Sequence, residues 1–396
     1  MNYLTKTIQG YIKPNQITKQ QLNLISKGCS FVYNHFLNQR IECDKNKQKQ
    51  PTKEQQEREL VQLKANNSWL NQIYSQILKQ VVRVRVADAW KKYREYKTIN
   101  FKAKYPRLKT DNRWYDSFSY TQNNRSFGIE NNQLFIKLGS AVEKNQRKLT
   151  IKLKLNQPIQ GIIKTLTIAW KNNKWLVSFG CWIEPKQINK TGREIGIDRG
   201  VKKLFATSEG WKYTNPKYFQ KGEEQLIKLQ RELSRKKKGG KNYQEKKLEL
   251  VQKHEKVSNR IKDRNHKLSR KIVDKFDLIG LEDLKSKEMT ERKKDKKRKV
   301  NRSLAKSIIR ACWYQLAQFL SYKVKETGKE VIVVNPKNTT QRCSQCGKLA
   351  NPKIERDVEI YNCSCGLVLD RDVNATKNIL YLAQNNRLGT LPTELV

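Results

Sequence analysis

The sequence predicts a multidomain α+β protein, and three observations lead to this fold class. The chain has 396 residues, which is enough for two or three domains with a sizeable core. Its hydrophobic periodicity changes from strand-like to helical and back to strand-like. Near the C-terminus, four cysteines stand in two close pairs, which indicates a small metal-bound module.

The N-terminal half predicts one sheet module interrupted by helices. Residues 3–13 have the pattern of a single strand, which Pro14 ends, and residues 18–102 have apolar residues at helical spacing. Beyond Pro106 the period is close to two, and residues 164–183 predict a hairpin across a Lys-Asn-Asn-Lys turn. We therefore expect a small β-barrel with a helical insertion. Within that insertion, the polar stretch 44–53 separates the helices, and apolar residues at 74–90 mark one long helix.

The C-terminal half predicts strands and helices in alternation. A Gly-Gly pair inside 221–274 predicts two antiparallel helices, and the very polar stretch 285–302 predicts a mobile, solvated loop. The remaining expected elements are strands ending at Asp198, Thr207, Glu282 and Val334, a helix over 305–327 and a last helix over 373–383 that begins at Asp372.

The charge balance indicates a polyanionic partner. Lysine and arginine number 83 and aspartate and glutamate 37, a formal net charge of +46. Nucleic acid is the natural partner for such an excess. We expect no membrane association, because the sequence has no apolar run of about 18 residues and no secretory signal pattern. We expect a cytoplasmic, nucleoid-associated protein in which the isolated thiols Cys29, Cys43, Cys181 and Cys312 stay reduced.

Three acids follow or precede apolar segments far apart in the chain. Asp198 and Glu282 end predicted strands, and Asp372 opens the last helix. Two-metal-ion phosphodiester hydrolysis needs carboxylates that converge from different elements, and such carboxylates hold Mg²⁺. Each acid also has an ordinary explanation: a turn at Asp198, a solvated loop at Glu282 and a helix cap at Asp372. Together they predict a metal-dependent nuclease.

The cysteine pairs predict a structural zinc site. Cys343 and Cys346 have the usual two-residue gap, whereas only one residue separates Cys363 from Cys365. Four protein ligands would leave no open position for catalysis. The short second gap is expected to strain the backbone, and the alternative is four unliganded thiols.

Basic runs with aromatic neighbours suggest contacts with phosphates and bases. The runs are 235–241 and 292–299, and the aromatics lie at 90–96 and 113–115. Such aromatics can stack on bases. The alternatives are that the charge runs are merely solvated and that Trp90 packs inside its helix core, which we favour.

Several motifs resemble the signature blocks of the TnpB (OrfB) family, which insertion sequences encode and which is similar to the ancestors of type V CRISPR effectors. They are Ile195–Gly200, Leu281–Leu284, Asn335–Gly347 and Leu369–Ala375, with Phe31–Leu37 resembling the family's first helix. The resemblance implies a RuvC triad of an RNase H-like fold formed by Asp198, Glu282 and Asp372, with Mg²⁺ or Mn²⁺ as its ions. The single-residue gap at Cys363–Cys365 departs from the family pattern.

The resemblance also implies a domain plan and partners. The implied domains are a wedge β-barrel (1–14 and 106–190), a helical recognition domain (15–105), a RuvC-like core (191–342 and 367–396) and a zinc ribbon (343–366). A monomer in a bacterial or archaeal host would bind a guide RNA from the element's end and cut double-stranded DNA beside a short motif. The residues implied in motif reading are Tyr74, Gln76, Lys79, Gln80, Thr121, Gln122 and Asn123.

Two other functions remain open at this point. One is a DNA-binding repressor or accessory factor of transposition without cleavage. The presence of an acid at all three triad positions disfavours it. The other is a DNA-joining transposase with the same fold and acids, which would act on element ends without a guide RNA.

Overall fold

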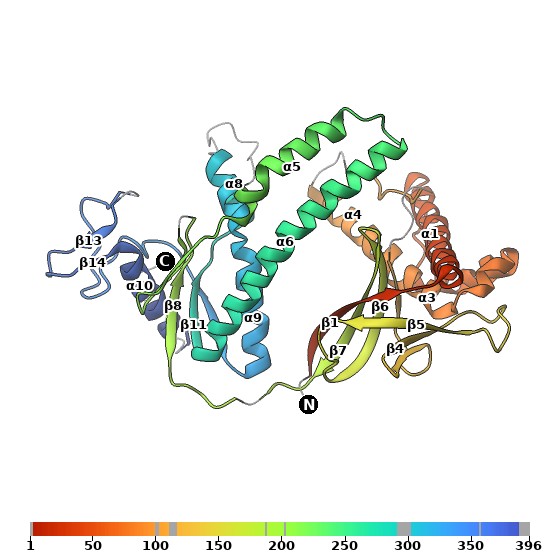
Figure 1. The fold of residues 1–396 in the computed structure, drawn as a ribbon, viewed down its shortest axis with the longest axis horizontal. Coiled ribbons are helices and arrows are strands. Elements are labelled where there is room, and N and C mark those ends of the chain that lie inside the picture. The colour runs from red at the N-terminus through yellow and green to blue at the C-terminus, as the bar shows by residue number, and fades with distance from the viewer. Residues whose placement is uncertain are drawn as a thin grey trace. The chain divides into compact units, whose positions relative to one another are not determined.

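The computed structural model divides into two compact units, residues 1–184 and 185–396 (Figure 1). It describes residues 3–99, 103–110, 117–186, 188–201, 203–290, 302–355 and 358–387. Each unit buries an apolar core of its own, because one large cluster lies wholly in the first unit and two clusters lie in the second. The mixed α+β fold class is confirmed.

The first unit contains a seven-stranded antiparallel sheet, in the order β2-β6-β7-β1-β5-β4-β3. The first strand of the chain lies near its middle, between β7 and β5. The predicted hairpin is confirmed, and its turn residues Asn172 and Asn173 have φ of 51° and 63°, as a tight hairpin turn requires. Closure into a barrel stays a prediction, since the described pairs leave β2 and β3 at the two edges. The strands are β1 (Leu4–Lys13), β2 (Ser117–Tyr120), β3 (Phe127–Glu130), β4 (Gln133–Lys137), β5 (Lys148–Leu155), β6 (Ile162–Lys171) and β7 (Lys174–Ile183).

Helices stand between β1 and β2, as expected for the insertion. They are α1 (Gln16–Lys45), α2 (Lys53–Asn66), η1 (Ser68–Gln72), α3 (Ser75–Gln80), η2 (Val81–Val86) and α4 (Ala87–Ile99). The prediction of one uniform helix across 74–90 is wrong in detail, because η2 is a π-helical turn between two α-helical segments. Extra backbone in such a turn rotates the faces of the flanking helices relative to each other.

The second unit contains a five-stranded mixed sheet in the order β10-β9-β8-β11-β12. Strands β8, β11 and β12 are parallel, whereas β9 and β10 run antiparallel to their neighbours. One face packs on α6, α8 and α9, and α10 covers the other face. The strands are β8 (Glu194–Asp198), β9 (Lys203–Thr207), β10 (Lys212–Thr214), β11 (Leu278–Glu282) and β12 (Glu330–Val334). The helices are α5 (Tyr218–Ser234), α6 (Lys241–Lys275), α7 (Ser286–Thr290), α8 (Arg302–Ala311), α9 (Trp313–Thr327) and α10 (Arg371–Arg387).

Two glycines bring α10 close to this sheet. Gly196 and Gly280 are register partners on β8 and β11. A Cβ at Gly196 would lie 2.0 Å from the main-chain oxygen of Thr376, and one at Gly280 would lie 3.0 Å from Cβ of Ala383. Because these two glycines have no side chains, α10, which carries Asp372 in its first turn, can pack directly against the strands.

Three sequence predictions for this unit need correction. The expected helix over 305–327 is two helices, because Cys312 has φ of 55° and ends the first. Residues 286–290 inside the expected loop form α7, and α10 begins at Arg371 rather than Asp372.

The basic run 292–299 and the aromatics at 113–115 lie outside the described residues.

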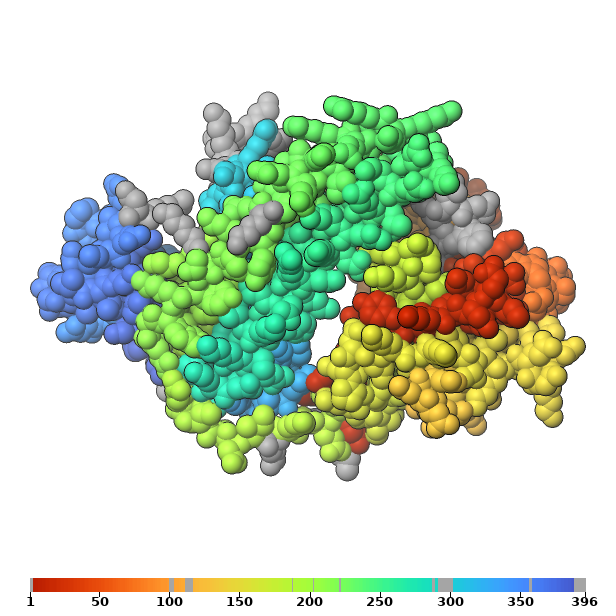
Figure 2. Space-filling model, viewed as in Figure 1, coloured from red at the N-terminus to blue at the C-terminus, as the bar shows by residue number. Residues whose placement is uncertain are grey.

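The two predicted antiparallel helices are α5 and α6, and the basic run 235–241 lies at their turn, away from the sheet (Figure 1). In the space-filling view of Figure 2, residues around β13 (Ile360–Asn362) and β14 (Val368–Asp370) form a separate knob on the second unit. Among the described residues, none of the helices combines the length and apolar character needed to cross a membrane.

Candidate functional site

The structure brings Asp198, Glu282 and Asp372 together. Asp198 ends β8 and Glu282 ends its parallel neighbour β11, so the two carboxyls lie at the same edge of the sheet. Burial, followed by the charges of Glu282 and Asp372, raises the pKa of Asp198 to about 7. Burial also raises the pKa of Glu282, against hydrogen bonds and the positive charge of Arg199. Asp198 is thus close enough to both other acids for their charges to act on it, and it connects the three into one site.

Asp372 is not the cap of its helix. That position is taken by Asp370, whose Oδ1 accepts a hydrogen bond from the main-chain N of Val373 at 3.1 Å. Asp372 instead faces Lys203, whose Nζ lies 3.5 Å from its Oδ2, and Asp370 pairs with Lys212. Helix capping therefore leaves the Asp372 carboxylate available to the site.

Arg199 is a member of the site that the sequence analysis missed. Its side chain is only 8% exposed and donates from Nη2 to the main-chain oxygen of Glu282. It thereby joins the ends of β8 and β11 directly behind the two acids. Its position immediately after Asp198 is the signal that could have indicated this role.

The four cysteine sulfurs form one cluster. All four lie within 4.8 Å of one another, and this is the one such group of potential metal ligands found in the described part of the chain. The Sγ atoms of Cys343 and Cys365 are 3.6 Å apart, as are those of Cys346 and Cys363. A tetrahedral zinc with Zn–S bonds of about 2.3 Å places sulfurs roughly 3.8 Å apart. The single residue between Cys363 and Cys365 therefore does not prevent their sulfurs from joining the cluster, and the four sulfurs can hold zinc.

The local backbone also favours the metal-binding form of this cluster. The second pair lies in the β13–β14 turn. The main-chain N–H of Cys365, together with contacts to the other three sulfurs, lowers the pKa of Cys363 to about 6. The main-chain N–H of Leu367 also lowers the pKa of Cys365, but the shared sulfur contacts raise it to about 12. A thiolate is the form that binds metal. Of the other four cysteines, Cys29 and Cys181 are buried and Cys43 and Cys312 are partly buried; their reduced state stays a prediction.

The carboxylate oxygens of Asp198, Glu282 and Asp372 do not form a cluster as tight as that of the four sulfurs, whose atoms lie within 4.8 Å of one another. This wider spacing is consistent with a different kind of metal site. Carboxylates that serve two ions about 3.5–4 Å apart need not all meet at one point. Oxygen donors suit Mg²⁺ or Mn²⁺, whereas thiolates suit zinc. The donor sets of the two clusters therefore match the two metals expected from the sequence.

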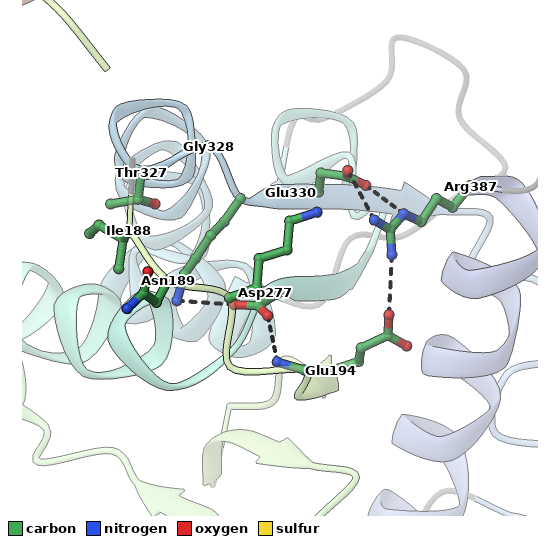
Figure 3. Close-up of a pocket in the computed structure, with 11 residues that line it drawn as sticks. Ile188, Asn189, Glu194, Asp277, Thr327, Gly328, Glu330 and Arg387 are labelled. Atoms are coloured by element: carbon green, nitrogen blue, oxygen red, sulfur yellow. Dashed lines mark hydrogen bonds and ion pairs between the residues drawn. The ribbon is translucent and has the colours of Figure 1, made fainter. Parts of the chain in front are cut away.

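A cavity of about 840 Å³ lies at the opposite ends of the parallel strands (Figure 3). Its charged groups neutralise one another: Arg387 pairs with Glu194 at 3.3 Å and with Glu330 at 3.1 Å, and Lys329 pairs with Asp277 at 3.3 Å. Arg387 thereby connects α10 to the first residues of β8 and β12. These ion pairs link the first residues of the strands, and none of the three acids lines the cavity.

Two of the segments implied in DNA-motif reading are adjacent in the first unit. The Tyr74 hydroxyl donates to Oε1 of Gln122 at 2.8 Å, and Gln76 lies 3.5 Å from the Thr121 hydroxyl. Lys79 instead pairs with Glu57 of α2. Gln80 and Asn123 are partly buried in the same two segments. The role of all seven residues stays a prediction.

Trp90 belongs to the core, as favoured from the sequence. It is 2% exposed and packs on Tyr93 and Tyr105, so it is not available for stacking on a base. Tyr96 on the same helix is 55% exposed.

Comparison with known proteins places these features in a family. The family model OrfB_IS605, described as "Probable transposase", matches residues 179–293, which include Asp198 and Glu282. The model "Cas12f1-like, TNB domain" matches residues 313–379, which include all four clustered cysteines and Asp372. A "Putative RNA-guided DNA endonuclease" of Streptomyces pristinaespiralis is 31% identical over 70% of this chain. The chain belongs to the TnpB (OrfB) family.

Other TnpB relatives extend the similarity. The "Putative RNA-guided DNA endonuclease InsQ" of Escherichia coli is 28% identical over 93% of this chain and 90% of its own length. The chain spans 65% of the length of the Streptomyces relative. Among solved structures, the Cas12f1 chain of a Cas12f1–sgRNA–target DNA complex matches with a TM-score of 0.60 and 14% identity, covering 96% of this chain and 99% of the other. That likeness extends the relation to the overall fold.

Proposed function

We propose that this chain is an RNA-guided DNA endonuclease of a transposable element that cleaves double-stranded DNA beside a short flanking motif. The observation that carries the proposal is the convergence of Asp198, Glu282 and Asp372 from two strand ends and a helix start. The names of the Streptomyces and Escherichia coli relatives support a guide RNA and a DNA substrate. The net charge of +46 supports a nucleic-acid partner.

The order of the five-stranded sheet, with its antiparallel β9 and parallel β8, β11 and β12, supports an RNase H-like core of the RuvC type. Bound Mg²⁺ or Mn²⁺ would stabilise both the attacking and leaving oxygens of the scissile phosphate. The three carboxylates would hold those ions, and Arg199 would keep the two strand ends in register. Because burial and the other two acids raise the pKa of Asp198, a bound cation would favour its charged form.

The sulfur cluster would hold a structural zinc that fixes the segment between β12 and α10. The remaining proposals follow the family: a guide RNA from the element's end, motif reading by the segments around Tyr74 and Gln122, and a monomeric cytoplasmic protein. Base pairing with the guide would then read the target sequence, while the protein reads only the flanking motif.

The test is cleavage by a purified ribonucleoprotein. The chain is co-expressed with the non-coding RNA that flanks its gene, and target plasmids with randomised flanks are offered with and without Mg²⁺. We expect Mg²⁺-dependent double-strand cuts at guide-matched sites and none with Asp198→Ala. Protection of the target without cuts would favour a repressor, and strand transfer of element ends without RNA would favour a transposase.

A further inference from the structure

A buried hydroxyl contacts one of the three acids. Thr339 lies in the segment that follows β12, and its side chain is almost fully buried. Its Oγ1 is 2.5 Å from Oε1 of Glu282 and 3.1 Å from the main-chain oxygen of Pro336. A hydroxyl has one proton to donate, and a charged carboxylate makes the shorter and stronger bond. Thr339 therefore donates to Glu282 and fixes the orientation of that carboxyl group.

Helix α10 holds the main chain of this segment. Asn378 donates from Nδ2 to the main-chain oxygens of Thr339, at 2.9 Å, and Arg342, at 2.7 Å. One turn earlier, Asn374 donates to the same Arg342 oxygen at 2.7 Å and accepts from the main-chain N of Ser344 at 2.8 Å. Both asparagines are buried. Buried amides are normally hydrogen-bonded, and here their partners are main-chain atoms of residues 339–344, so α10 fixes the path of that segment.

The same segment leads directly into the sulfur cluster. Ser344 follows Cys343, whose main-chain N donates to the oxygen of Lys348 at 2.9 Å. The side chain of Arg342 bridges the turn by donating to the oxygen of Gly347 at 2.7 Å. A continuous set of hydrogen bonds thus joins the first cysteine pair, the two asparagines of α10 and Glu282.

We propose that Thr339 is the positioning residue for Glu282, and that Asn374 and Asn378 hold it in place from α10. The acid site and the cysteine module would then share one hydrogen-bonded frame rather than being independent sites. The inference rests on the proposed function, because it assigns a role toward the metal ions that the three acids would hold. Residues that hydrogen-bond to a metal-ligating group commonly change metal affinity by about 10–100-fold when removed.

The test measures metal binding to the full chain, without RNA and without cleavage. Mn²⁺ is the probe, titrated by electron paramagnetic resonance, and the zinc content and thermal unfolding of each variant are recorded. Thr339→Val removes the hydroxyl at nearly constant volume, and Thr339→Ser keeps it. Thr327→Val is the matched control, because Thr327 is also buried but its hydroxyl donates to main-chain oxygens of its own helix, at Lys323 and Val324.

We expect Thr339→Val to weaken Mn²⁺ binding by about tenfold or more, with zinc content unchanged. Thr339→Ser should bind within about threefold of the parent, and Thr327→Val should bind like the parent even if its melting temperature falls. Asn378→Ala keeps the Thr339 hydroxyl but removes the hydrogen bond that holds the Thr339 main chain, so it should also weaken Mn²⁺ binding. This variant replaces Thr339→Val in the test if Thr339→Val does not fold. Parent-like binding by either Thr339→Val or Asn378→Ala would overturn the inference.

A further pair of variants separates this inference from the proposed function. Asp198→Asn and Asp372→Asn remove proposed ligands directly. If both retain parent-like Mn²⁺ binding, the metal site itself is refuted. If both lose binding while Thr339→Val keeps it, the metal site stands and only the positioning role fails.

Discussion

Replacing Gly196 by alanine is expected to damage both the stability of the second unit and the acid site. The new Cβ would lie 2.0 Å from the main-chain oxygen of Thr376, 2.8 Å from the main-chain N of Leu380 and 3.0 Å from Leu380 Cβ. Non-bonded carbon contacts are favourable only at about 3.5–4 Å. Because two of these three contacts are with helix backbone, rotation of a side chain cannot relieve them, and α10 must move by about 1 Å or more.

The energetic cost follows from that displacement. Overpacking in a core costs about 1–3 kcal/mol, and the backbone contacts put Gly196→Ala near the upper value, about 3 kcal/mol. For a unit of the size of residues 185–396, that cost corresponds to a fall in melting temperature of roughly 6–12 °C. Asp372 is carried on the displaced helix, and a misplacement of about 1 Å can reduce a rate about 100-fold.

Calorimetry of the full chain and cleavage rates of the ribonucleoprotein measure the two effects. Gly222→Ala in α5 is the matched control, because the neighbour that its Cβ would meet is a single side-chain atom, Cγ2 of Val257 on α6 at 3.2 Å, rather than helix backbone. Alanine is a better helix former than glycine, so this control should unfold no earlier than the parent. If Gly196→Ala melts within about 2 °C of the parent and cleaves at the parent rate, the close seating of α10 is refuted.

Three further outcomes are expected. Cys365→Ser should lower the zinc content of the purified protein to well below one ion per chain, whereas Cys312→Ser should leave it unchanged. Equal zinc contents in the two variants would contradict zinc binding by the cysteine cluster. Burial alone would raise the pKa of Asp277, but the Gly192 N–H, Thr191 and Lys329 lower it, so the charged carboxylate stabilises the fold above about pH 4 and this stabilisation disappears below. Asp277→Asn should therefore be less stable than the parent near neutral pH and equally stable in acid, as measured by unfolding at a series of pH values. A difference in stability that persists in acid would contradict the assignment. Tyr74→Phe removes the bond to Gln122 and should alter the preferred flanking motif without changing guide RNA binding; an unchanged motif in a randomised-target assay would argue against motif reading there.

Strongly periodic segments were predictable from the sequence, since their pattern depends on local geometry. The hairpin of β6 and β7, the helix pair α5 and α6, and the strands ending at Asp198 and Glu282 were all predicted, because alternating or three-to-four spacing marks which face is buried. The cysteine cluster was predictable for the same reason, because ligand spacing within a turn is a local property.

Other features depend on contacts between distant segments and were missed or wrong. The break at Cys312 has no glycine or proline to mark it, and Trp313 donates from Nε1 to the main-chain oxygen of Gly200 beside it. Periodicity gave no sign of the π-helical turn η2. The buried groups around the acids, Arg199 and Thr339, were also missed, since only the fold brings Thr339 to Glu282, 57 positions away.

The separate cores described for the two units have a practical consequence for engineering. Within the ranges that the structure describes, the apolar cluster of residues 8–181 and the clusters of residues 195–383 have no side chain in common, so each half has its own source of folding free energy. A chain cut between Glu184 and Pro185 should therefore yield two fragments that each fold cooperatively. Such halves, fused to ligand-dependent dimerising partners, would allow a small molecule to control the proposed cleavage activity.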